Sequence, residues 1–123
     1  MRVVPTLKFV LFLLLALASL PLFAEQADVE QRKIDYLIAE VGQLKDAHFI
    51  RNGTEYDVDK AVAHLQLKRR NAGSRVRTAE DFIRYCATGS SMSGEKYRIR
   101  FASGEAVDAA VFFEQRLAAY PAH

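Results

Sequence analysis

The sequence predicts an α+β fold: a mostly helical single domain with a short β-hairpin and one further strand, preceded by a signal peptide. Three observations lead to this prediction. An apolar segment opens the chain. Apolar residues then recur at helical spacing over Gln26–Leu44. An Asn-Gly pair after that segment separates two short runs that contain aromatic and β-branched residues.

Residues 1–24 have the features of an export signal. Arg2 and Lys8 form a cationic start, an apolar run follows, and the segment ends with Pro21-Leu22-Phe23-Ala24. The apolar stretch is shorter than the ~20 residues that span a bilayer, so no stable membrane span is expected after processing. Removal of this segment leaves 99 residues, 25–123, which suits one compact domain.

The first element of the domain is a helix over Gln26–Leu44, with acidic residues at its start, where the helix dipole favours negative charge. The hairpin follows over Phe49–Tyr56, and its turn is Asn52-Gly53, two residues that tolerate positive φ. Each arm holds only about three residues, so the hairpin must pack against the helices.

Two more helices follow the hairpin. Asp57 or Asp59 caps a helix that runs to about Asn71 and stops at Gly73. Thr78 caps the next helix, whose first turn is acidic and whose inward face carries Phe82, Ile83 and Cys86.

A loop rich in serine and glycine, Gly89–Gly94, breaks that helix. Tyr97–Phe101 alternates apolar and basic residues, which is typical of a half-buried strand that can join the hairpin. The chain turns at Ser103-Gly104, and a final helix is predicted over Glu105–Ala119.

The predicted domain is neutral overall, with 15 basic and 15 acidic residues once Arg2 and Lys8 are removed. The charges are uneven, because Lys60–Arg100 holds ten basic residues and only three acidic ones. This segment either presents an anion-binding surface or lies beside the acidic first helix. No nucleic-acid partner is expected, since no recognised binding motif is present.

Cys86 is the only cysteine, so no internal disulfide can form. Its place on the apolar stripe of the third helix predicts a buried, inert thiol, with an intermolecular disulfide and then a catalytic thiol as the alternatives. The sequence contains no paired histidines and no Cys/His spacing that would indicate a metal site. No cofactor is expected either.

Several segments resemble the YfeK-like family of small exported bacterial proteins. They are Phe49–Gly53 with Tyr56, Ala61–Leu65 with Lys68, Thr78–Glu80 with Phe82-Ile83, and Ser90–Gly94 with Tyr97. The resemblance covers roughly residues 34–101, in the same order and at matching spacing. It implies a periplasmic or secreted protein of a Gram-negative bacterium and implies no chemistry. The chain departs from the family at Lys96, where members often have proline, and at Ala47-His48, where some members have a cysteine.

Eight polar residues in or beside the predicted elements are candidates for a binding site: Arg51, Asn52, His64, Lys68, Ser90, Ser91, Ser93 and Tyr97. Several of these residues also have a purely structural explanation. Asn52 suits the turn, His64 can be hydrogen-bonded at the edge of the core, and the serine loop can satisfy the carbonyl end of a helix.

As a site, the loop could cradle a carboxylate or phosphate while Arg51 or Lys68 supplies charge. The sequence therefore favours a non-enzymatic binding module that recognises an acidic envelope component, an envelope protein or an anionic ligand. One alternative is a small periplasmic hydrolase that uses His64 with a loop serine, although no nucleophile motif is present. Another is an assembly or inhibitor module that acts by surface contact alone.

Overall fold

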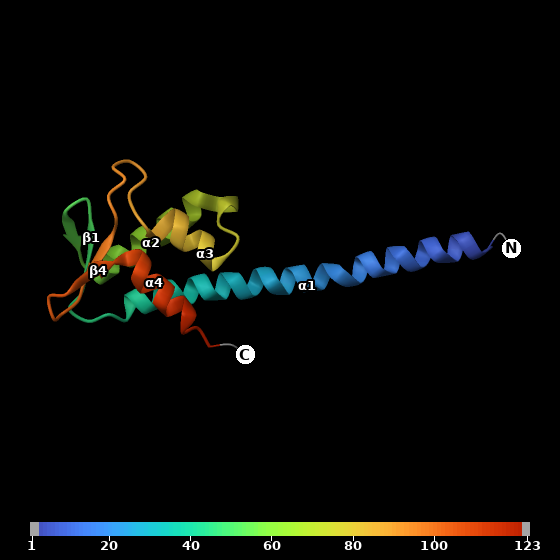
Figure 1. Ribbon diagram of the computed structural model, residues 1–123, viewed down its shortest axis with the longest axis horizontal. Coiled ribbons are helices and arrows are strands. Elements are labelled where there is room, and N and C mark those ends of the chain that lie inside the picture. Colours follow the sequence, from blue (N-terminus) through green and yellow to red (C-terminus); the bar gives the residue numbers. More distant parts are fainter. Residues whose placement is uncertain (1–2, 122–123) are drawn as a thin grey trace.

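The computed structural model describes residues 3–121, and their side chains from residue 22 onward (Figure 1). The chain forms helices that pack against one face of a small antiparallel sheet, and the α+β class is the one that the sequence predicted. In order, the elements are α1 (Val3–Gly42), β1 (His48–Arg51), β2 (Thr54–Tyr56), α2 (Val58–Ala72), η1 (Gly73–Arg75), α3 (Ala79–Phe82), η2 (Ile83–Ala87), β3 (Arg98–Arg100), β4 (Ala106–Asp108) and α4 (Ala109–Ala118).

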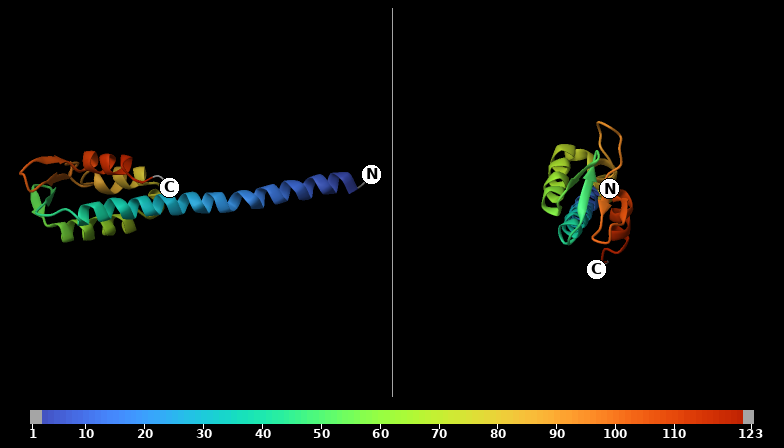
Figure 2. Two further views of the ribbon diagram at one scale, coloured as in Figure 1. Left: turned by 90° about the horizontal axis from the view of Figure 1, so that it is seen from below. Right: turned by 90° about the vertical axis from the view of Figure 1, so that its left-hand side faces the viewer.

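The C-terminal half of α1 is the central helix of the domain. It packs against α2, α3 and α4, and Figure 2 shows it between α2 and α4. Its buried face consists of residues at helical spacing: Ile34, Leu37, Ile38 and Val41. The predicted helix over Gln26–Leu44 is thus the packed part of a longer helix.

The N-terminal half of α1 projects away from the domain (Figures 1 and 2). Residues 22–28 are all exposed, and Leu22 and Phe23 keep 66% and 71% of their surface accessible. Burial begins with Val29, so the start of the predicted domain at residue 25 precedes the first core contact. Most of the side chains of the predicted export signal, residues 1–24, lie outside the described part of the structure.

Among the residues whose side chains are described, no helix is both long and apolar enough to span a membrane.

The hairpin and the second helix lie within one residue of their predicted bounds. Asn52 and Gly53 both have positive φ, 51° and 77°, which the tight turn between β1 and β2 requires. The Asp57 carboxylate accepts a hydrogen bond from the Lys60 backbone N–H and caps α2. Gly73 ends the helix with a φ of 55°.

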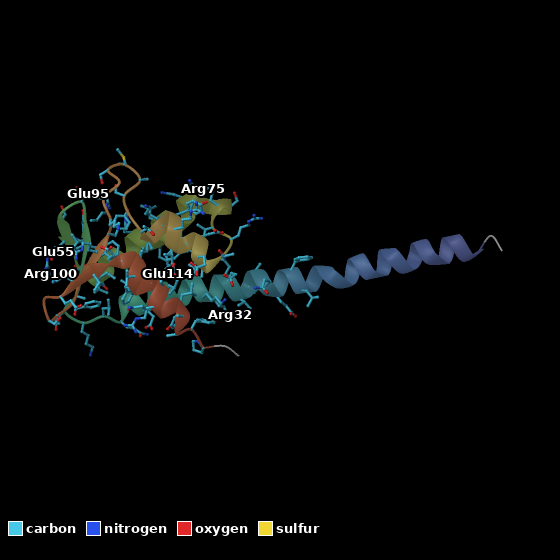
Figure 3. The ribbon with its side chains drawn as sticks, in the orientation of Figure 1. Arg32, Glu55, Arg75, Glu95, Arg100 and Glu114 are labelled. Atoms are coloured by element: carbon cyan, nitrogen blue, oxygen red, sulfur yellow. The ribbon has the colours of Figure 1, made fainter. Side chains whose placement is uncertain are left out.

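The sheet has the order β2-β1-β3-β4, with all neighbours antiparallel. Its register aligns one row of apolar residues across all four strands: Tyr56, Phe49, Ile99 and Val107. This row faces the helices, because Phe49 and Ile99 are buried in the core. The opposite face carries ion pairs, including Arg100 with Glu55 at 2.7 Å, which Figure 3 shows side by side.

The third helical segment is irregular. Thr78 and Asp81 form a reciprocal capping box at its start, as predicted for a Thr cap. After Phe82, however, the helix widens into a π-helical turn, η2. The Thr88 hydroxyl then donates to the Ile83 carbonyl at 2.7 Å and satisfies one backbone group at its end.

The C-terminal region differs from the prediction. Residues 106–108 form a fourth strand, β4, and the final helix begins at Ala109 rather than at Glu105. The turn at Gly104, with a φ of 91°, returns the chain alongside β3, and Val107 pairs with Ile99. Sheet pairing therefore outweighs the helical preference of this short segment.

Cys86 is fully buried, as predicted for an inert thiol. Burial raises the pKa of this thiol above its ordinary value, which keeps it protonated.

Candidate functional site

Four of the predicted site residues meet where α2 crosses the helix-facing side of the sheet. Arg51 lies two residues after Phe49 on β1, and strand alternation directs both to this side. His64 and Lys68 are one turn apart on α2. Tyr97 lies two residues before Ile99 and is only 2% exposed.

These four side chains form one hydrogen-bonded chain. Arg51 Nη1 lies 3.1 Å from His64 Nδ1, and His64 Nε2 lies 3.4 Å from the Tyr97 hydroxyl. Lys68 Nζ donates to the same hydroxyl at 3.1 Å and to the Gly89 carbonyl at 3.4 Å. The Tyr97 hydroxyl is therefore the junction between the arginine and the lysine.

The hydrogen bonds among these four side chains define the tautomer and the charge of His64. A guanidinium has only donors, so His64 Nδ1 must accept and the ring proton sits on Nε2, from which it donates to Tyr97. Desolvation lowers the pKa of His64 below its ordinary value of 6.5, and the positive charges of Arg51 and Lys68 lower it further. The imidazole is thus held neutral between two cations.

Neither Arg51 nor Lys68 forms an ion pair with a carboxylate among the described residues. Other basic residues of the same segment do: Arg69 reaches Asp35 of α1 at 2.6 Å and also binds Gln31. The basic segment therefore lies in part beside the acidic first helix, which is one of the two expectations. Some of its charges pair with the acidic helix, and others remain available.

Two cavities flank the four hydrogen-bonded side chains. We call the first the lysine groove; it has a volume of about 470 Å³, and its lining includes Lys68, Arg75, Arg84, Tyr85, Ser90 and Ser91. We call the second the hairpin pocket; it has a volume of about 140 Å³ and is lined by Phe49, Arg51, Tyr56, Lys60, Ala61 and His64. Neither lining contains an acidic residue.

The lysine groove gathers three cationic side chains. Arg75 and Arg84 approach the Tyr85 ring, with guanidinium carbons 5.8 and 5.4 Å from its centroid. Neither arginine forms an ion pair within the described part of the chain. The groove is therefore a concentration of positive charge without internal neutralisation.

The serine loop forms one wall of this groove. Its two arms approach closely at Gly89, where a Cβ atom would lie 2.8 Å from the Glu95 carbonyl oxygen, so only glycine fits there. The Ser90 hydroxyl is used within the loop, since it accepts from the backbone N–H groups of Met92 and Ser93. Ser91 is exposed and lines the groove.

Asn52 and Ser93 do not line either cavity. The Ser93 hydroxyl donates to the Asn52 side-chain oxygen at 2.5 Å and ties the serine loop to the hairpin turn. The eight predicted residues thus fall into three groups: the hydrogen-bonded chain, the groove-lining serines, and this tie.

The sequence reasoning missed Arg75, Arg84 and Tyr85 as lining residues. The excess of basic residues in Lys60–Arg100 was a signal for the two arginines, but it could not separate them from Arg69, which is paired. Tyr85 lies beside Cys86 on the outer side of the irregular helix and is 40% exposed.

The geometry gives the loop serines no base. Both ring nitrogens of His64 contact Arg51 and Tyr97, and within the described residues no serine hydroxyl is hydrogen-bonded to the imidazole. Nor does that part of the chain bring together three side chains of the metal-ligating types.

Fold and site together define a small α+β domain with a cationic groove and a buried tyrosine at the junction of sheet and helix. The chain belongs to a family described as "Family of unknown function (DUF5329)", which matches residues 28–121. It is 37% identical over 90 residues to "Uncharacterized protein YfeK" of Salmonella typhimurium, covering 73% of this chain and 75% of that protein. These matches confirm the predicted membership of a YfeK-like family. No solved structure matches the chain.

Proposed function

We propose that this protein is a non-enzymatic binding module that recognises an acidic, multiply charged group on an envelope component or partner. The ligand would lie in the lysine groove. One observation carries the proposal: three cations, Lys68, Arg75 and Arg84, line one concave surface that contains no carboxylate.

The physical argument is electrostatic. Like charges that converge on a concave surface repel one another, and an anion removes that repulsion while it gains charge-assisted hydrogen bonds. Arginine can bind two oxygens of a phosphate or carboxylate in parallel, whereas lysine acts as a point charge. Three converging cations favour a multiply charged ligand over a single carboxylate.

Lys68 has a defined orientation for this role. Its bonds to the Tyr97 hydroxyl and the Gly89 carbonyl use two of its three N–H donors. The third donor is free for a ligand, and the exposed Ser91 hydroxyl lies on the same groove wall. An oxyanion could therefore meet a prepositioned ammonium group rather than a mobile one.

Calorimetric titration with pyrophosphate as the probe tests the proposal. We expect Lys68→Gln and Arg75→Gln each to weaken binding by about tenfold, because each removes one charge-assisted contact. Arg32→Gln is the matched control, since Arg32 is an exposed residue of α1 that Figure 3 shows far from Arg75. Equal affinity in all three variants and the unmodified protein would refute the assignment.

We also propose that the protein is periplasmic or secreted after cleavage near residue 24. The cationic start and the apolar run support this, and so does the exposure of residues 22–28, which leaves the proposed cleavage site accessible. Amino-terminal sequencing of the protein from fractionated cells should find a start near Glu25 in the periplasm or medium. An intact Met1 terminus in the cytosolic fraction would contradict the proposal.

A further inference from the structure

The hairpin pocket differs from the groove in ways that point to another ligand. Its walls are mainly apolar and come from three elements: Phe49 on β1, Tyr56 at the end of β2, and Ala61 on α2. Phe49 and Ala61 are buried, so the pocket reaches the edge of the core. The small side chain of Ala61 leaves space that a larger residue would fill.

The size of the pocket limits what it can hold. An apolar cavity of about 150 Å³ is known to accept a benzene-sized molecule. At about 140 Å³ the hairpin pocket is close to this volume. It therefore suits one aromatic ring or a short branched aliphatic group.

The rim of the pocket is positive. Arg51 and Lys60 both line it, and neither has a carboxylate partner among the described residues. The Arg51 guanidinium carbon lies 5.8 Å from the Tyr56 ring centroid, and Nη1 is held by His64. Because one nitrogen is fixed, the other N–H groups of the guanidinium have a defined direction and remain without a hydrogen bond within the described chain.

We propose that the hairpin pocket binds a small carboxylic acid whose apolar body is about the size of a benzene ring. The body packs between Phe49, Tyr56 and Ala61, and the carboxylate binds Arg51, with Lys60 as a second cation. His64 is a positioning residue here, because its neutral Nδ1 accepts from Arg51 and holds the guanidinium at the rim. This inference does not depend on the function proposed for the lysine groove.

The experiment is a titration of the protein, purified from cells that express the full chain, with benzoate, and it is followed by NMR. We expect backbone shifts at Ala61 and His64 and none at Ser91. Benzamide has the same shape without the charge, and acetate has the charge without the ring. Each should bind at least about tenfold more weakly than benzoate.

Variants separate this pocket from the groove. Arg51→Gln keeps a donor for His64 but loses the charge, and we expect it to weaken benzoate binding by about tenfold. Arg75→Gln and Arg32→Gln should leave benzoate binding unchanged. Ala61→Leu, which fills the space, should abolish the shifts, and Arg51→Gln keeps the test valid where that variant does not fold.

Three results would overturn the inference. They are equal binding of benzamide and benzoate, an unchanged benzoate affinity in Arg51→Gln, and shifts that map to Ser91 and disappear in Arg75→Gln. If the unmodified protein binds benzoate but not pyrophosphate, the result counts against the proposal for the lysine groove and leaves the proposal for the hairpin pocket standing.

Discussion

Lys68 of the lysine groove and His64 of the hairpin pocket are hydrogen-bonded to the same tyrosine hydroxyl, but the two cavities differ in size and lining. The groove is the larger, at about 470 Å³ against 140 Å³, and serines and basic side chains form much of its lining. The hairpin pocket is mainly apolar, with two basic residues at its rim. Neither lining contains an acidic residue, so the two cavities differ in their exposure to water more than in the sign of their charge.

This difference has consequences for how each cavity would bind. Charges on a wide polar surface are screened by salt over roughly 8–10 Å, whereas a small apolar site excludes water and ions. We therefore expect binding in the groove to depend strongly on salt and on the number of ligand charges. Binding in the hairpin pocket should depend on the fit of an apolar body.

The substitution with the largest expected effect removes the Tyr97 hydroxyl, which is hydrogen-bonded to one lining residue of each cavity. Tyr97→Phe deprives both Lys68 and His64 of a partner, so it should lower the free energy of unfolding by about 1–3 kcal/mol. Urea unfolding measures this change. Tyr120→Phe is the control, because that ring packs on Tyr36 outside the hydrogen-bonded chain. A loss below about 0.5 kcal/mol, as expected for an ordinary surface substitution, would show that the hydroxyl does not act as a bridge.

A smaller effect concerns the charge state of His64. Its pKa is lowered in the folded protein, so the unfolded chain takes up a proton first as the pH falls below about 6.5. Stability contributed by the neutral imidazole is complete above that pH and declines as the pH falls toward the folded pKa. In His64→Gln, whose amide can accept from Arg51 and donate to Tyr97, the loss of stability between about pH 7 and pH 5 should be shallower.

Unfolding curves across this pH range give the measurement for the His64 variant, and His48→Gln is the matched control because His48 is exposed. A pH dependence that is the same in His64→Gln and in the unmodified protein would mean that His64 titrates normally. The hydrogen-bonded chain would then not hold the imidazole neutral.

Much of the fold could be predicted because it rests on short-range signals. Asp57 and Thr78 cap helices through contacts three residues away, and Asn52-Gly53 supplies the φ values of its turn. The error at residues 105–108 arose where local preference and sheet pairing disagree. Nothing nearby in the sequence reveals that Val107 will pair with Ile99.

The candidate site was predictable as a set of residues but not as an arrangement. Arg51, His64, Lys68 and Tyr97 do meet, although Arg51 faces the hairpin pocket while Lys68 faces the groove. Asn52 and Ser93 instead bind one another. Ion pairing decides which basic side chains remain available for a ligand. Which of them are paired depends on which helix packs beside them.

The sequence by itself determined the caps, the hairpin turn, the buried face of α1 and the positive excess of the middle segment. These features depend on the order and spacing of neighbouring residues. Only the tertiary structure decided that Tyr97 would lie against His64, 33 positions away, and that Arg75 and Arg84 would converge with Lys68. The physical reason is that contacts between distant segments depend on how the helices and the sheet pack, which no local pattern encodes.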